Sequence, residues 1–143
     1  MSVPVLEAIA DAIYLYEGNK ARDRAYRNRN PGNLRPTDAS QPRDGAGYRV
    51  FPYFTVGYNA LLHDLGSKVT GLNRSGLNFD SSLEDLFNVY APSADHNAPE
   101  KYTDFVASWL NQVYQTESIG RKTTFRQLDL MVREENQSGV PAP

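Results

Sequence analysis

The chain has 143 residues, which is enough for one domain with a substantial core and too few for two independent ones. Its 40% hydrophobic and 22% charged residues are those of an ordinary soluble globular protein. The net charge of -2 provides no overall field for nucleic acid or an acidic membrane surface. The absence of cysteine excludes disulfides, thiolate metal sites and thiolate nucleophiles. No signal peptide is visible at the N-terminus, and no window is long enough to span a bilayer.

The N-terminal segment 3–17 is predicted to form an amphipathic helix with one buried stripe. Glu17 would lie at the end of this stripe, and Gly18 can supply the left-handed conformation that ends a helix. Partial burial and the negative end of the helix dipole both favour the protonated carboxyl, so its pKa should rise. A protonated carboxyl is what a general acid for glycosidic cleavage requires, although a glutamate at this position is more often a solvated end residue. The stripe consists of Leu6, Ile9, Ile13 and Tyr16.

The segment from Lys20 to Arg35 is polar and basic, and its Asn-Pro-Gly-Asn sequence predicts an ordered loop. Tyr48–Phe51 alternates like a strand and is expected to pair with Leu34–Arg35 as a small hairpin. Four further helices are then predicted, which makes about five helices in a mostly α (α+β) domain over residues 1–135. Residues 136–143 are expected to form a disordered tail. The four later helices begin after Thr55, at Ser82, at Pro99 and near Thr124.

This order of elements resembles the lysozyme-like superfamily. The specific residues are Tyr16-Glu17-Gly18, the block Arg29-Asn-Pro-Gly-Asn-Leu-Arg35, Phe51 with Gly57 and Leu61, and Tyr90-Ala-Pro-Ser with Asn97 and Tyr102. Together they look like small phage-type murein-degrading proteins, which are virion-associated and have a lytic transglycosylase-like or muramidase-like fold. The resemblance covers roughly residues 5–130.

The resemblance implies that Glu17 is the catalytic acid, which would protonate the oxygen between N-acetylmuramic acid and N-acetylglucosamine in peptidoglycan. A glycan groove also needs amide and guanidinium donors for hydroxyl and acetamido groups, and rings for sugar faces. Plain core packing is an equal alternative for Phe51 and Tyr102, whereas Tyr90 is favoured because it ends a helix before a proline turn. The predicted substrate-binding residues are Asn30, Asn33, Arg35, Tyr48, Phe51, Tyr90, Asn97 and Tyr102.

The sequence departs from that of a glycoside hydrolase because it shows no recognisable second catalytic carboxylate. Retaining and inverting hydrolases pair two carboxylates, whereas a lytic transglycosylase uses one, which acts as acid and then as base while the muramyl 6-hydroxyl closes a 1,6-anhydro ring. No aspartate here falls in a recognisable motif, so transglycosylation is slightly favoured over hydrolysis. The aspartates available to a hydrolase are Asp23, Asp38, Asp44 and Asp95.

Three functions are therefore compared. The first is a murein glycosidase, and the second is a non-catalytic murein-binding or virion structural protein with the same fold. The third is a nucleic-acid-binding domain that uses the basic run, which is disfavoured because the run lacks interleaved aromatic residues. The first hypothesis implies peptidoglycan glycan strands as the partner, no nucleic acid, a monomer, and no cofactor or metal. Action would be at the bacterial cell wall, after delivery as a phage lysin, a virion component or a secreted effector.

Overall fold

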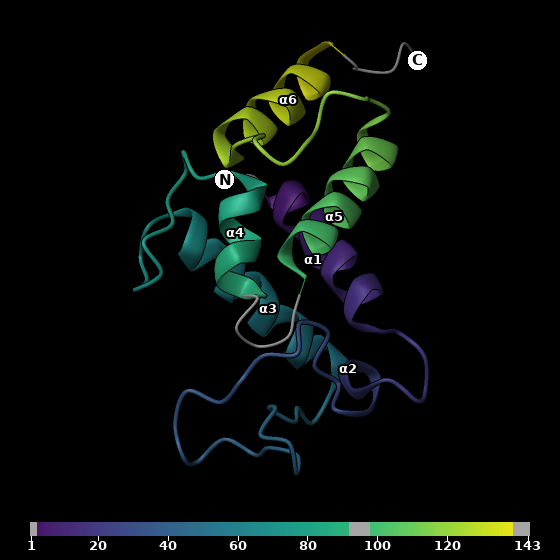
Figure 1. Cartoon of the computed structure of the whole chain (residues 1–143), viewed down its shortest axis with the longest axis vertical. Coiled ribbons are helices and arrows are strands. Elements are labelled where there is room, and N and C mark those ends of the chain that lie inside the picture. Colours follow the sequence, from purple (N-terminus) through teal and green to yellow (C-terminus); the bar gives the residue numbers. More distant parts are fainter. Residues whose placement is uncertain (1–2, 92–97, 139–143) are drawn as a thin grey trace. The chain divides into compact units, whose positions relative to one another are not determined.

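The computed structural model describes residues 3–91 and 98–138, which form six helices and almost no strand (Figure 1). The mainly helical fold is thereby confirmed. The predicted first helix agrees with α1 at both ends, and the helix predicted to begin at Pro99 agrees with the start of α5, whereas the four-residue α2 was not predicted. The helices are α1 (Val3–Glu17), α2 (Arg24–Arg27), α3 (Phe54–Val69), α4 (Leu83–Tyr90), α5 (Pro99–Tyr114) and α6 (Phe125–Ser138).

The chain divides into two compact units. The smaller unit is Ala10–Leu65, and the larger consists of Met1–Ile9 with Gly66–Pro143. The boundaries fall within α1 and within α3, so the smaller unit holds the end of α1, all of α2 and most of α3. Glu17 and the Asn-Pro-Gly-Asn block both belong to this smaller unit.

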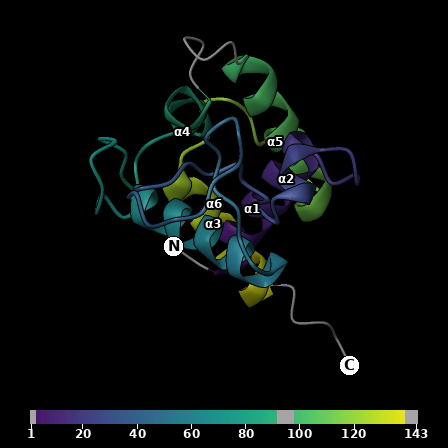
Figure 2. The ribbon, with the colours of Figure 1, turned by 90° about the horizontal axis from the view of Figure 1, so that it is seen from below.

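The predicted hairpin does not form regular strands. In the part of the chain between α2 and α3, Figure 2 draws no arrow, and the only bridge there joins Arg43 to Arg49. Arg49 N–H does donate to the Leu34 carbonyl at 2.9 Å, so the two expected segments meet at one hydrogen bond. The next donors diverge, because Val50 N–H bonds the Pro42 carbonyl and Phe51 N–H bonds the Asn28 carbonyl. A ladder cannot form where consecutive amides are bonded to different segments.

In the larger unit, α4 begins with the predicted capping box. The Ser82 hydroxyl accepts from the Asp85 N–H at 3.1 Å, and the Asp85 carboxylate accepts from the Ser82 N–H at 2.9 Å. The loop that leads from α5 to α6 returns to this point, since Leu83 N–H donates to the Thr123 carbonyl at 3.0 Å. Helices α4 and α5 pack through stacked rings of Phe87 and Tyr102, whose centroids lie 4.5 Å apart.

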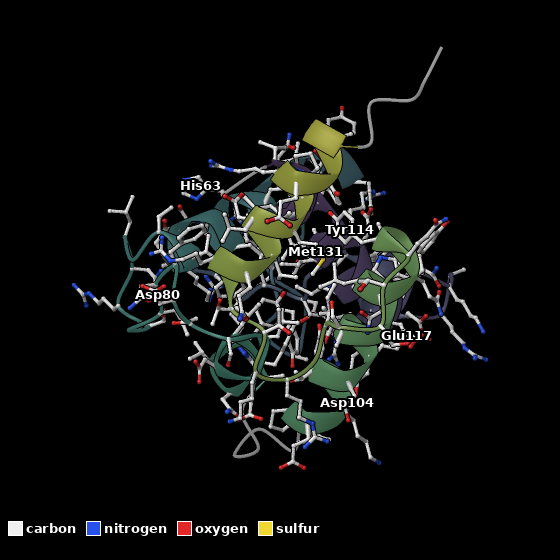
Figure 3. All side chains as sticks on the ribbon, turned by 90° about the horizontal axis from the view of Figure 1, so that it is seen from above. His63, Asp80, Asp104, Tyr114, Glu117 and Met131 are labelled. Carbon is white, nitrogen blue, oxygen red and sulfur yellow. The ribbon has the colours of Figure 1, made fainter. Side chains whose placement is uncertain are left out.

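Exposed ion pairs complete the larger unit. Arg121 forms a bidentate pair with Asp104 of α5, and Arg126 pairs with Asp80; both aspartates are labelled in Figure 3. These arginines lower the pKa of both carboxyls through hydrogen bonds to the charged form. Exposed pairs of this kind add little stability each, so the packed helices carry the unit.

The C-terminal prediction was wrong in part. Helix α6 continues to Ser138, so residues 136–138 are helical and do not belong to a disordered tail. Residues 139–143 lie outside the described part of the chain. None of the described helices has the length and apolar character that crossing a bilayer requires.

Helix α3 approaches the Asn-Pro-Gly-Asn block at a glycine. A Cβ atom added at Gly57 would lie 2.0 Å from the Arg29 carbonyl oxygen and 3.1 Å from Pro31 Cδ. Backbone atoms cannot move aside as the end of a flexible side chain can, so any side chain at this position must displace the loop from the helix.

Gly57→Ala is therefore expected to destabilise the protein by at least about 1–3 kcal/mol, in spite of the better helix propensity of alanine. Gly66→Ala on the same helix is the matched control, because its added Cβ would lie 3.8 Å from Leu6 Cδ1, an ordinary contact. That control should be neutral or stabilising by up to about 1 kcal/mol. Urea unfolding of both variants measures the difference, and equal stabilities would contradict the assigned close contact.

Candidate functional site

Glu17 is the last residue of α1, and its side chain is half-buried. The helix ends at Gly18, whose N–H donates to the Tyr14 carbonyl at 2.9 Å and whose φ is +123°. A Cβ at Gly18 would lie 2.5 Å from the Asp23 side chain, so both the backbone conformation and the space require glycine. The Glu17-Gly18 pair therefore stands at a sharply turned helix end, as the sequence predicted.

Asn33 contacts this carboxylate directly. Its Nδ2 donates to Glu17 Oε2 at 3.0 Å, although the two residues are 16 positions apart. The backbone of Asn33 is left-handed, with a φ of 48°, a conformation that asparagine tolerates better than most residues. The Asn33 N–H donates to the Asn30 carbonyl at 3.0 Å, which holds the turn. The structure thus brings together the two sequence motifs, and the sequence did not predict this contact.

The other atom of the same amide is unsatisfied. Asn33 Oδ1 is buried and has no hydrogen-bond partner among the described residues. An amide group presents a donor on one side and an acceptor on the other, and a rotation of the group exchanges them. When Glu17 is a carboxylate, Asn33 Nδ2 donates a hydrogen bond to it. When Glu17 is a carboxylic acid, Asn33 Oδ1 can accept a hydrogen bond from its O–H. The site can therefore hydrogen-bond Glu17 in either protonation state.

Asn30 has a structural position, which departs from the substrate-binding role expected for it. Its side chain is fully buried, and all of its polar atoms are occupied. Nδ2 donates to the carbonyls of Leu34 and Arg49, both at 2.9 Å, while Oδ1 accepts from the Leu34 N–H at 2.9 Å. This one amide joins segments 19 residues apart, so it holds the loop and has no group left for a ligand.

Arg35 and Tyr48 lie together at the surface of the same loop region. The Tyr48 ring is flanked by two guanidinium groups, with Arg24 at 4.4 Å and Arg35 at 4.3 Å from its centroid. Arg35 Nη2 also donates to the Tyr48 hydroxyl at 3.3 Å. Arg24 in turn lies 3.4 Å from the Asp44 carboxylate. Arg35 and Tyr48 thus form a cationic surface in which two guanidinium groups lie over one ring.

The remaining predicted substrate-binding residues are Phe51, Tyr90, Asn97 and Tyr102, and the structure describes three of them. Phe51 is only 1% exposed, and Tyr102 only 2%, so both pack in the interior as the core alternative predicted. Tyr90, in the larger unit, is half-buried and packs edge-on against Phe87, with the centroids 6.1 Å apart. Asn97 falls outside the described residues.

The aspartates considered as second carboxylates are engaged in their own loops. Asp23 accepts from the Lys20 N–H at 3.0 Å, and Asp38 accepts from the Ser40 N–H at 2.8 Å. Asp44 accepts from Asn28 Nδ2 at 2.8 Å and from the Tyr48 N–H at 2.9 Å. These hydrogen bonds lower the pKa of Asp38 and of Asp44. Asp95 lies outside the described residues.

A cavity in the smaller unit was missed by sequence reasoning. It has a volume of about 630 Å³ and lies among aromatic and arginine side chains of α1, α2 and the start of α3. The available signal was Tyr26, the only ring of the basic run, beside Arg27 and Arg29, but the other rings of the cavity come from distant positions. The lining residues are Tyr14, Tyr26, Arg27, Arg29, Tyr53 and Phe54.

Metal chemistry finds no support in the part of the chain that the structure describes, where no group of His, Asp or Glu is placed to hold an ion. His63, for example, is exposed on α3 (Figure 3). The chain matches no protein-family model, no curated protein and no solved structure.

Asn30→Asp tests the structural role of the buried amide. The carboxylate has the same shape but cannot donate to the two carbonyls, and it brings an uncompensated charge into the interior. We expect a loss of at least about 3 kcal/mol in the free energy of unfolding. Asn59→Asp on the exposed side of α3 is the control and should change stability by less than about 0.5 kcal/mol. A mild effect at Asn30 in chemical denaturation would contradict its assigned role.

Proposed function

We propose that this chain is a peptidoglycan-degrading glycosidase that cleaves the bond between N-acetylmuramic acid and N-acetylglucosamine, with Glu17 as the general acid. The observation that carries the proposal is the hydrogen bond from Asn33 Nδ2 to Glu17 Oε2 at 3.0 Å. It joins the carboxyl at the end of the first helix to the Asn-Pro-Gly-Asn block, two of the motifs that carry the lysozyme-like resemblance. A solvated end residue would have no need of such a partner.

The proposed reaction uses one carboxyl group twice. The protonated Glu17 gives its proton to the bridging oxygen as the glycosidic bond breaks, and positive charge develops on the muramyl ring. The resulting carboxylate then removes a proton from the attacking hydroxyl group. Asn33 supports both stages, because Oδ1 can accept from the acid and Nδ2 donates to the carboxylate.

The attacking hydroxyl is the 6-hydroxyl of the same muramyl residue in lytic transglycosylation, and water in hydrolysis. The first route is preferred because no partner carboxylate falls in a recognisable motif, and Asp23, whose side chain lies against Gly18, is the described aspartate that hydrolysis would use. In either case the proposed contact to the glycan within this unit is Arg35, which lies over the Tyr48 ring and can donate hydrogen bonds to sugar hydroxyl and acetamido groups.

Glu17→Gln keeps the size of the side chain and its hydrogen bonds but removes the titrating group. We expect it to fold like wild type and to lose murein cleavage by a hundredfold or more, on the order of what general acid catalysis contributes. Mass spectrometry of products from purified sacculi is the measurement. Anhydromuramyl products from wild type alone indicate transglycosylation, and reducing muramyl ends indicate hydrolysis. Cleavage by the variant at the wild-type rate would refute the proposal, and binding to sacculi without products from either protein would support the murein-binding alternative.

Asn33→Gly removes the side-chain amide and keeps the left-handed backbone, because glycine adopts that conformation without strain. Losing a hydrogen bond to a charged group costs about 1.5–3 kcal/mol, so kcat should fall roughly tenfold to a hundredfold with little change in KM. The alkaline limb of the pH–rate profile should move to higher pH, since the donor favours the charged carboxylate. Asn59→Gly controls for general loosening, and an unchanged pH profile in Asn33→Gly would leave Asn33 without a part in proton transfer.

A further inference from the structure

The cavity in the smaller unit has no part in the chemistry proposed at Glu17. Its six lining residues are three tyrosines, one phenylalanine and two arginines. None of them is among the site residues predicted from the sequence. Its volume of about 630 Å³ falls within the roughly 300–1,000 Å³ that sites for small ligands occupy.

The rings of this cavity are exposed to an unusual degree. Tyr53 is 70% exposed, Tyr26 49% and Phe54 40%. The Phe54 ring is packed against two others, since its centroid lies 5.1 Å from that of Tyr14 and 6.0 Å from that of Tyr58. Several large rings exposed around one hollow are costly to solvate, and they mark a surface that a ligand covers.

The two arginines are the available charges. Neither Arg27 nor Arg29 forms an ion pair with any residue that the structure describes, whereas the neighbouring Arg24 is paired with Asp44. The backbone of Arg29 is held beside the cavity, since its φ is 51° and its carbonyl oxygen lies against Gly57. Two unpaired guanidinium groups beside one cavity favour carboxylates, which they bind through paired N–H groups.

A carboxylate also acts on one of the lining rings, that of Tyr14. The pKa of Tyr14 is raised by burial, then by Tyr26 and by the nearby Asp23 carboxylate. The Tyr14 hydroxyl therefore stays protonated and can donate a hydrogen bond, while Asp23 disfavours a ligand that is uniformly anionic. This mixture fits a chain with separate carboxylates and small aliphatic groups better than it fits a polyphosphate backbone.

We propose that this cavity binds a short acidic peptide, namely the peptide stem that murein carries on its muramyl residues. Arg27 and Arg29 pair with the carboxylates, and the faces of Tyr26, Tyr53 and Phe54 cover the small aliphatic side chains. The identity of the peptide rests on the proposed glycosidase function. The consequence is a preference for peptide-bearing glycan over glycan stripped of its peptides.

Calorimetric titration with a purified, sugar-free stem peptide tests the proposal directly, in about 0.15 M salt to screen non-specific attraction. Wild type should bind the peptide, and the double variant Arg27→Gln with Arg29→Gln should bind at least tenfold more weakly. Arg22→Gln is the matched control, because Arg22 is an exposed arginine of the same basic run outside the cavity. It should bind like wild type, and Tyr53→Ser should weaken binding without unfolding the protein.

Several outcomes would overturn the proposal. They are no binding of the peptide by folded wild type, an equal loss in Arg22→Gln, or binding of a single-stranded oligonucleotide in place of the peptide through the same two arginines. Failure of the glycosidase proposal is distinguishable, because product analysis of sacculi does not depend on this titration. Peptide binding without glycan cleavage would retain the cavity assignment alone, and cleavage without peptide binding would retain the glycosidase alone.

Discussion

The buried side chain of Asn30 is the interaction on which the smaller unit depends. The block from Asn30 to Gly32 is buried although it has no regular secondary structure, so its polar groups need partners within the protein. The Asn30 side chain finds its partners in the Leu34 N–H and the carbonyls of Leu34 and Arg49, and so ties the block to the segments that follow it. A side-chain amide thus takes the place of the ladder that the predicted hairpin would have provided. Removing it would take this partner from the Leu34 N–H and the Arg49 carbonyl, whereas the Leu34 carbonyl would keep its bond from the Arg49 N–H.

This fixed block has a left-handed residue on either side of it. Arg29 precedes the block with a φ of 51°, and Asn33 follows it with a φ of 48°. Non-glycine residues in this region persist where the surrounding contacts hold them, and they are frequent at functional positions. Arg29 is held by the close approach of its carbonyl to Gly57, and Asn33 by its N–H bond to Asn30 and its amide bond to Glu17. One rigid segment therefore positions both the cavity arginine and the partner of the candidate acid.

The helices were predictable from sequence because each buries a periodic apolar face or begins at a recognisable cap. The Ser82–Asp85 capping box is an example in which residue type and spacing alone suffice. Helix α2 was not predictable in this way, because four residues make barely one turn and contain no repeat. The hairpin failed for a different reason: the alternation at Tyr48–Phe51 was real, but its hydrogen bonds are divided among three segments. Pairing partners of this kind are set by tertiary packing.

Within the site, the sequence identified Glu17 and the Asn-Pro-Gly-Asn block but could not assign roles to the two asparagines. Asn30 and Asn33 carry the same donor and acceptor groups, and only their backbone conformation and burial distinguish the structural residue from the one that faces Glu17. The basic run presented the same difficulty. In the sequence it is one patch of charge. In the structure Arg24 is paired with Asp44, and both Arg24 and Arg35 stack on the Tyr48 ring. The cavity arginines, in contrast, have no ion-pair partner among the described residues. The fold thus gives side chains of the same type different positions, some bonded within the protein and others placed where a ligand could reach them.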